Sequence, residues 1–393
     1  LVDLSTFFKK ILRTGNSIAC YLSKNDSSFI INSYLPECKE MSLHFALGHI
    51  PKIWTNNQYV VNQSANLSIR RNLTKSIGCY SNNDVEHVLR ELLFESIPIC
   101  YLEGFNELLK EVSLRKWPAS PKFIFTSNNY DTDEVFKLWT AIKVKEGSKY
   151  IIGQHGNMLR CARYSRSTID LEILDKFISW GGSDVRLQVF PAFIFKTAGK
   201  KIKRHNSSGG MLIILCHYPH RCSVWDGSVN YIDTFENHKE FIRIMPIEYR
   251  RLLTVRLHSA WRYFNWHEKE RLDMFNGQIN IEEGAVSIDK LIKENRLVIH
   301  GYDSTGILET LSMNIPTLAF WSGGLDHVRD EAKPYYELLI NCGIIHFDPE
   351  SIAEKVQSIW GDVESWWSSE DIQFARKTFC DQYANSCDAP ITK

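Results

Sequence analysis

Short apolar runs alternate with longer amphipathic segments along the chain from about residue 121. "KFIFTSNN" predicts a strand, "DTDEVFKLWTAIKVKEG" predicts a helix that ends at Gly147, and "KYIIGQHG" predicts the next strand. The alternation continues through "STIDLEILDKF" and "ISWGG". Strands that alternate with helices in this way are typical of an α/β fold with a parallel sheet.

A second alternating series begins near residue 210. "MLIILCHYP", "RLLTVRLHS" and "CGIIHFD" predict strands, and the helices between them are predicted near 231–243, in "SIDKLIKEN" and in "PESIAEKVQSIWGDV". The stretch "VIHGYDSTGILETLSMNIPTLAFW", residues 298–321, predicts strand, turn, helix and strand in that order. The tail "SSEDIQFARKTFCDQYANSC" predicts one more amphipathic helix.

The basic stretch "KTAGKKIKRHNSSGG", residues 196–210, separates the two series and ends in Ser and Gly, as linkers do. We therefore expect a GT-B-like α/β architecture, in which two Rossmann-like doubly wound domains face a central cleft. Residues 1–200 would form an acceptor-side domain, with 1–120 largely helical and harder to interpret. Residues 208–393 would bind a nucleotide sugar and close with a helix over 368–387.

Composition narrows the class of protein. The 393 residues are enough for two domains, and the 46 basic and 46 acidic residues cancel, which argues against a nucleic-acid partner. No run of 18 apolar residues predicts a transmembrane segment. The ten cysteines are scattered without a CxxC pair, which favours a reducing cytoplasm over a disulfide framework. The missing initiator Met suggests one module of a larger protein.

The break Gly301–Gly306 in the 298–321 stretch is the strongest candidate site. Ser304, Thr305 and Gly306 occupy the predicted first turn of a helix, where unpaired N–H groups and the positive end of the helix dipole favour a phosphate. Glu309 lies one turn further and can accept from ribose hydroxyls. Plain N-capping by Asp303 or Ser304 is the structural alternative.

The chain resembles a family of transferases encoded in bacterial O-antigen and surface-polysaccharide gene clusters. The resemblance covers roughly residues 120–386 and is carried by "GYDSTGILETLSMNIPTLAFW", by "YIIGQHGNMLR", "EILDKFISWGG" and "TVRLHSAW", and by the tail. The chain departs from that family at three places. It has Gly156-Asn157 where relatives tend to have Gly-Gly, Gly182 where they usually have an aromatic, and His258-Ser259 where they usually read Tyr-Pro.

The motif "QHG" places Gln154, His155 and Gly156 at the carboxyl end of a predicted strand. His155 is a candidate acid–base group because a histidine titrates near neutral pH, and the alternative is a buried turn histidine. Glu172 and Asp175 stand at (i, i+3) on one predicted helix face. They are candidate acid–base and acceptor-binding groups, although a surface role fits equally.

Arg256 and His258 end a predicted strand two residues apart, hence on the same side. The pair resembles the strand-end histidine motif of CMP-sugar transferases and would meet a phosphate or the carboxylate of an acidic sugar, with a structural salt bridge as the alternative. We also count Tyr302, which lies in the break, among the nucleotide-binding residues. Asp226 and Asp233 are weak candidates for a catalytic carboxylate.

A metal site is not expected. His217, His220 and Cys222 invite a zinc interpretation, but no fourth ligand has a suitable spacing. Neither a GxxxxGK[ST] loop nor a GxGxxG fingerprint is present, which argues against ATP hydrolysis and dinucleotide chemistry.

The resemblance implies a cytoplasmic glycosyltransferase that needs no cofactor beyond its nucleotide-sugar donor, with CMP-Kdo as the expected donor and a glycan or lipid-linked glycan as acceptor. The alternatives are a CDP-alcohol phosphotransferase of the teichoic-acid type, a transferase of another nucleotide sugar, a nucleotide-sugar 2-epimerase, and a degenerate scaffold without activity. Peripheral membrane contact through "KKIKRH" and Trp366-Trp367 stays open, against a solvated linker and core tryptophans.

Overall fold

The computed structural model describes residues 14–55, 59–77, 84–163, 172–182, 188–200, 206–216 and 231–390. The chain forms two compact units, Leu1–Gly153 and Gln154–Lys393. The expected division into 1–200 and 208–393 assigned functions to two halves, and that assignment stays a prediction. Within the described ranges, no helix is both long and apolar enough to cross a membrane.

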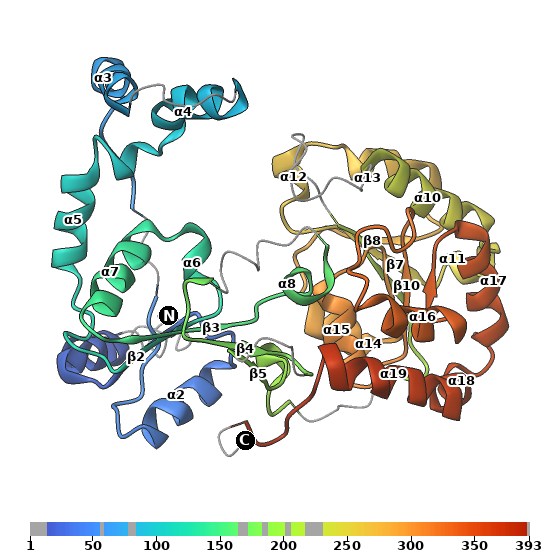
Figure 1. Ribbon diagram of the computed structural model, residues 1–393. Helices are drawn as coiled ribbons and strands as arrows, with labels where there is room; N and C mark the ends of the chain where they lie inside the picture. Colours follow the sequence, from blue (N-terminus) through green and yellow to red (C-terminus); the bar gives the residue numbers. More distant parts are fainter. Residues whose placement is uncertain are drawn as a thin grey trace, which may run out of the picture. The chain divides into compact units, whose positions relative to one another are not determined.

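The first unit contains three parallel strands, β1 (Ser28–Ile31), β2 (Phe123–Thr126) and β3 (Lys149–Gly153), paired in that order. Its helices are α2 (Glu37–Ala46), α3 (Leu67–Ile77), α4 (Asp84–Ser96), α5 (Phe105–Leu114), α6 (Asn129–Thr132) and α7 (Glu134–Lys145) (Figure 1). Phe29 on β1 is fully buried and packs with its ring centroid 4.8 Å from that of Trp139 on α7.

The sequence predicts α7 well because its ends carry clear signals. The Asp133 carboxylate caps the helix by accepting from the Phe136 N–H at 2.9 Å, and Gly147 beyond its end has a φ of 105°, which favours glycine. Within residues 1–120, which we expect to be largely helical, α4 and α5 are two successive helices. They are separated at Pro98, which lacks the N–H that a continuing helix needs.

The second unit contains a six-stranded parallel sheet in the order β11-β10-β9-β6-β7-β8. The strands are β6 (Gly210–Ile214), β7 (Leu253–Arg256), β8 (Asn280–Glu282), β9 (Asn295–His300), β10 (Thr317–Phe320) and β11 (Ile345–His346). The order steps outward from β6 in both directions, as in doubly wound sheets, so the expected α/β class is confirmed. The parallel strands β4 (Lys176–Ser179) and β5 (Val189–Pro191) pair with each other and precede this sheet in the chain.

Helices cover both faces of the six-stranded sheet. On β6, Met211 and Ile213 belong to one apolar cluster and Leu212 to another, because successive side chains on a strand point to opposite faces. The first cluster includes residues of α10 (Tyr231–Ile244) and α17 (Pro349–Ile359), and the second includes α14 (Ile288–Glu294). The remaining helices are α8 (Met158–Cys161), α11 (Ile247–Arg250), α12 (Trp261–Phe264), α13 (Glu268–Leu272), α15 (Thr305–Ser312), α16 (Lys333–Asn341) and α18 (Val363–Ser368).

The last described helix, α19 (Glu370–Tyr383), leads into a segment that binds back onto the region around β4 and β5. The Asn385 N–H donates to the Trp180 carbonyl at 2.6 Å, and the Asn385 carbonyl accepts from the Ile194 N–H at 2.9 Å. The backbone of Gln382 lies 2.7 Å from where a side chain at Gly181 would begin. The side chain of Gln382 occupies the space beside Gly182, so the terminal helix lies where a larger residue at position 182 would project.

Candidate active site

The predicted break lies where expected, between the end of β9 at His300 and the start of α15 at Thr305. Ser304 is the N-cap of α15 and not part of its first turn, and its Oγ accepts from the Ile307 N–H at 3.3 Å. The capping alternative is therefore observed, and phosphate binding stays a prediction that the cap does not contradict, since a capped helix still leaves its first amide groups without intrahelical partners.

A cavity of about 530 Å³ opens at this helix start, within the second unit. It is lined by residues that follow or end β6, β7 and β9, by α14 and by the first turns of α15. The lining residues are Asn157, Lys196, Ile214, Cys216, Arg256, His258, Ser259, Ile288, Ile292, His300, Tyr302, Asp303, Ser304, Thr305, Gly306, Glu309 and Thr310. The list contains all seven residues predicted from sequence to bind the nucleotide.

Hydrogen bonds that link Thr310, His300 and Ser304 fix the start of α15. The Thr310 hydroxyl donates to the Gly306 carbonyl at 3.1 Å, so it accepts from His300 Nε2, also at 3.1 Å. The imidazole Nδ1 is then the acceptor of the Ser304 hydroxyl, 3.3 Å away. The Ser304 hydroxyl therefore donates to His300. Burial lowers the pKa of His300 to about 3, which keeps the imidazole neutral.

Gly306 is required by this packing as well as by any ligand. A Cβ added there would lie 2.7 Å from His300 Cε1, which is closer than two carbons can approach. Gly156 is similar on the other side of the helix start, since its Cβ would lie 3.2 Å from Thr305 Oγ1. The absence of side chains at the two glycines lets the segment around Gly156, the end of β9 and the start of α15 pack closely together.

Asp303 holds the site together. Its carboxylate accepts from Asn157 Nδ2 at 2.7 Å and from the Tyr336 hydroxyl at 3.0 Å, and it lies 2.9 Å from His327 Nε2. Asn157 and Tyr336 are each only 1% exposed. Burial raises the Tyr336 pKa well above its usual range, and the Asp303 charge adds to the shift, so the phenol stays a donor.

Arg256 and His258 both reach the cavity but make protein contacts of their own. The Arg256 guanidinium donates to the carbonyls of Leu257 at 3.0 Å and Val286 at 3.2 Å, and it lies 3.4 Å from the Glu282 carboxylate. The structural salt bridge considered from sequence is therefore present. His258 Nδ1 accepts from the Ala260 N–H at 3.1 Å, so a neutral ring carries its proton on Nε2.

Glu309 and Tyr302 are two further cavity residues that the sequence predicts to bind the nucleotide. The Glu309 carboxylate lies 3.4 Å from Lys196 Nζ, a cation that comes from the segment expected to be a linker. Burial raises the pKa of Tyr302, and the neighbouring Cys216 raises it further, so the phenol is a neutral donor at physiological pH. These two side chains offer one anionic acceptor and one neutral donor to a bound ligand.

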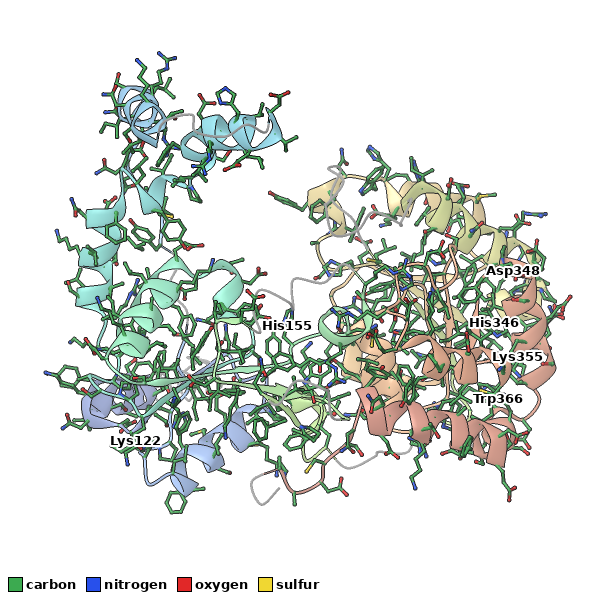
Figure 2. The ribbon with its side chains drawn as sticks, in the orientation of Figure 1. Lys122, His155, His346, Asp348, Lys355 and Trp366 are labelled. Carbon is green, nitrogen blue, oxygen red and sulfur yellow. The ribbon has the colours of Figure 1, made fainter. Side chains whose placement is uncertain are left out.

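Among the described residues predicted for acceptor binding and acid–base work, Gly156 lies beside the start of α15, whereas Gln154, His155, Glu172 and Asp175 are not among the residues that line the cavity. Gln154 is buried and uses both ends of its amide on the protein, donating to the Gly156 carbonyl and accepting from the Trp180 N–H, each at 3.0 Å. His155 follows β3 and is half-buried (Figure 2). Glu172 is exposed and Asp175 half-buried, both just before β4. Their roles stay predictions.

The weaker carboxylate and zinc candidates fall in or beside a part of the chain outside the described ranges. Asp226, His217, His220 and Cys222 lie outside the described residues, and Asp233 is exposed near the start of α10. Among the described residues, no cluster of His, Cys, Asp and Glu has the arrangement of a metal site.

Sequence reasoning missed Asn157, Lys196, His300 and Cys216 as cavity residues. Asn157 and Lys196 come from segments that are distant from the break in sequence, and no local spacing relates them to it. His300 had a signal, since a histidine that ends a buried strand needs partners for both ring nitrogens. Cys216 follows β6, and the rule that ligands bind at the carboxyl ends of parallel strands points to that position.

The chain belongs to the LIC12162 family of transferases, whose family model matches residues 3–393. A search among curated proteins gives no match to this sequence.

Three solved structures show a distant likeness to the chain. S. aureus MnaA in a co-structure with UDP has a TM-score of 0.47 and 14% identity, covering 91% of this chain and 99% of that one. Anabaena HepE in complex with UDP and glucose has a TM-score of 0.44 and 12% identity, with 92% and 96% covered. Acinetobacter baumannii MurG has a TM-score of 0.43 and 9% identity, with 93% and 96% covered. The family match thus establishes a transferase, and these likenesses are too distant to say which group it transfers.

Proposed function

We propose that this transferase is a GT-B-type glycosyltransferase of bacterial surface-polysaccharide synthesis, which takes a sugar from a nucleotide donor bound in the cavity at α15. The observation that carries the proposal is that Tyr302, Thr305 and Glu309, together with the start of an eight-residue helix, line one cavity beside Arg256 and His258. Helix amides and a cation are the groups that bind a diphosphate or monophosphate.

The chemistry of transfer follows from those contacts. As the glycosidic bond to phosphate breaks, negative charge grows on the departing phosphate oxygen. Amide N–H groups at the start of α15 and the Thr305 hydroxyl would donate to that oxygen, and Arg256 would add a positive field. Thr305 Oγ1 accepts from the Asn157 N–H at 3.2 Å, so its own proton is left to point toward the ligand.

CMP-Kdo remains our expected donor, with a glycan or lipid-linked glycan as acceptor and the cytoplasm as location. The support is the resemblance of the His258 strand end and the Ser304-Thr305 break to CMP-sugar transferases. His258 with a proton on Nε2 suits a phosphate or the carboxylate of an acidic sugar. A base or nucleophile on the acceptor side is proposed among His155, Glu172, Asp226 and Asp233.

A thermal-shift panel of CMP, CDP, UDP, GDP, ADP and dTDP tests the proposal. A ligand at about 100 times its Kd adds roughly 2.7 kcal/mol, which is several degrees in Tm for a unit of this size. Stabilisation by CMP alone supports CMP-Kdo as the donor. Preference for another nucleotide would change the expected donor sugar but still support nucleotide binding by the protein. Preference for CDP favours the phosphotransferase alternative, and turnover of a nucleotide sugar without acceptor favours the epimerase. No shift with any of the six overturns the proposed function.

A matched pair of variants ties the result to this cavity. Glu309→Gln removes the negative charge of the proposed ribose acceptor and should weaken binding of the stabilising nucleotide by roughly tenfold, because a hydrogen bond to a charged group contributes about 1.5–3 kcal/mol and a neutral one only about 0.5–1.5 kcal/mol. Glu364→Gln changes an exposed carboxylate away from the cavity and should leave the shift unchanged. Equal shifts in both variants would place the nucleotide elsewhere.

A further inference from the structure

Asn157 has an unused acceptor at the cavity. The residue lines the cavity and is 1% exposed, and its Oδ1 is buried without a hydrogen-bond partner among the residues that the structure describes. A buried acceptor without a donor costs about 1–3 kcal/mol, so a native structure rarely keeps one unless something else supplies the donor. The cavity beside the side chain is the place from which such a donor can come.

The orientation of this amide is fixed by its neighbours. The Asp303 carboxylate only accepts, so the atom 2.7 Å from it must be the amide nitrogen. The Tyr336 hydroxyl donates to Asp303 and is 3.2 Å from the same nitrogen, so it accepts there. Turning the amide over would set oxygen against oxygen at both contacts. Asp303 and Tyr336 both contact the Asn157 amide nitrogen, so they fix the side-chain orientation and leave Oδ1 as an acceptor without a bond to either of them.

The position of Asn157 limits what the missing donor is. Its backbone N–H donates to Thr305 Oγ1, so the residue sits at the first turn of α15, where the proposed function puts the phosphates. Phosphate oxygens at neutral pH carry almost no protons and do not donate to an amide oxygen. The ribose and the transferred sugar both flank the phosphates and carry donors. Because the proposed function assigns the ribose hydroxyls to Glu309, the donor to Asn157 is a hydroxyl or amide group of the transferred sugar.

We propose that Asn157 selects the transferred group, by accepting a hydrogen bond through Oδ1 from a neutral hydroxyl or N–H group of the donor sugar. The inference rests on the proposed function, because it needs the phosphates at α15. Asp303, which also lines the cavity, adds a negative charge to the same wall. A carboxylate on the sugar is therefore excluded from this wall and must lie toward Arg256 and His258.

The test measures two dissociation constants by calorimetry on the full chain. One ligand is the nucleotide that stabilises the wild type best, and the other is its sugar conjugate, which is CMP-Kdo for CMP and UDP-glucose for UDP. The readout is the Kd of the nucleotide divided by the Kd of its sugar conjugate. This ratio reports the contribution of the sugar to binding. Asn157→Ala keeps the backbone N–H that binds Thr305, and Asn157→Gly keeps it too and serves as the second variant.

Tyr336→Phe is the matched control. It removes a hydroxyl that contacts both Asn157 and Asp303 but does not itself line the cavity, so it loosens the same network without changing the acceptor. We expect the ratio to fall about 3- to 10-fold in both Asn157 variants, the effect of one neutral hydrogen bond, and to stay within about twofold in Tyr336→Phe.

Two results overturn the inference while leaving the proposed function intact. One is an unchanged ratio in the Asn157 variants, and the other is an equal fall in Tyr336→Phe, which would make Asn157 purely structural. A wild-type protein that binds none of the nucleotides instead overturns the proposed function, and this is seen before any variant is compared.

Discussion

Replacing Asp303 with alanine should strongly destabilise the second unit, although Asp303 lies in the turn between β9 and α15. The substitution leaves the Asn157 amide and the Tyr336 hydroxyl, both almost fully buried, without their acceptor, and it removes the partner of His327. Removing one partner of a buried charged network costs about 3–5 kcal/mol. For a unit of this size we expect Tm to fall by roughly 6–20 °C.

Asp330→Ala is the control for this change. Asp330 also has two cationic partners, Lys333 at 2.7 Å and Arg163 at 3.1 Å, but its side chain is 76% exposed. Exposed ion pairs contribute about 0–1 kcal/mol, so this variant should melt within a few degrees of the wild type. Both variants are followed by circular dichroism and by the urea midpoint. If Asp303→Ala melted alongside Asp330→Ala, the network would not stabilise the fold and our account of it would be refuted.

Three further outcomes are expected. Burial lowers the pKa values of His300 and His238 from 6.5 to about 3 and about 4, so the unfolded chain binds more protons than the folded chain near and below pH 6.5. Urea unfolding should therefore show stability falling by about 1.5 kcal/mol per ring as the pH is lowered from 6.5 to 5, and His300→Gln should flatten that slope. Gly306→Ala should cost about 1–3 kcal/mol in thermal melting through its contact with His300, whereas Gly361→Ala, which meets nothing within 4 Å, should cost under 1; equal losses would contradict the packing argument. Arg256→Lys should weaken nucleotide binding severalfold in the thermal-shift assay, because an ammonium cannot reproduce the guanidinium's two carbonyl contacts, and unchanged binding would remove Arg256 from the site.

The regular part of the fold could be predicted because its signals are local. The α7 helix has a capping aspartate and a terminal glycine, and the strands of the six-stranded sheet are apolar runs between turns. β1 was missed because its four residues are too few to show a period, and all are buried. The first third of the chain lacks the regular alternation that organised the rest.

The candidate site likewise contains residues that could be predicted from local sequence signals and residues that could not. The break at residues 301–306 could be found because a strand, a cap and a helix follow one another in sequence, and Arg256 and His258 because they end a neighbouring strand. Asn157 could not be found, since its importance depends on Asp303, which is 146 positions away. Periodicity carries no information about which distant loop meets a given strand end.

The segment after α19 also orders events in time. The Asn385 side chain donates to the Ala192 carbonyl across a separation of 193 residues. A ribosome adding about 5–20 residues per second needs roughly 10–40 s to make that stretch. Until then the Trp180 carbonyl, the Ile194 N–H and the Ala192 carbonyl lack the partners that Asn385 supplies. The contacts of the β4–β5 region with Asn385 therefore form late in synthesis, after the intervening residues have been made.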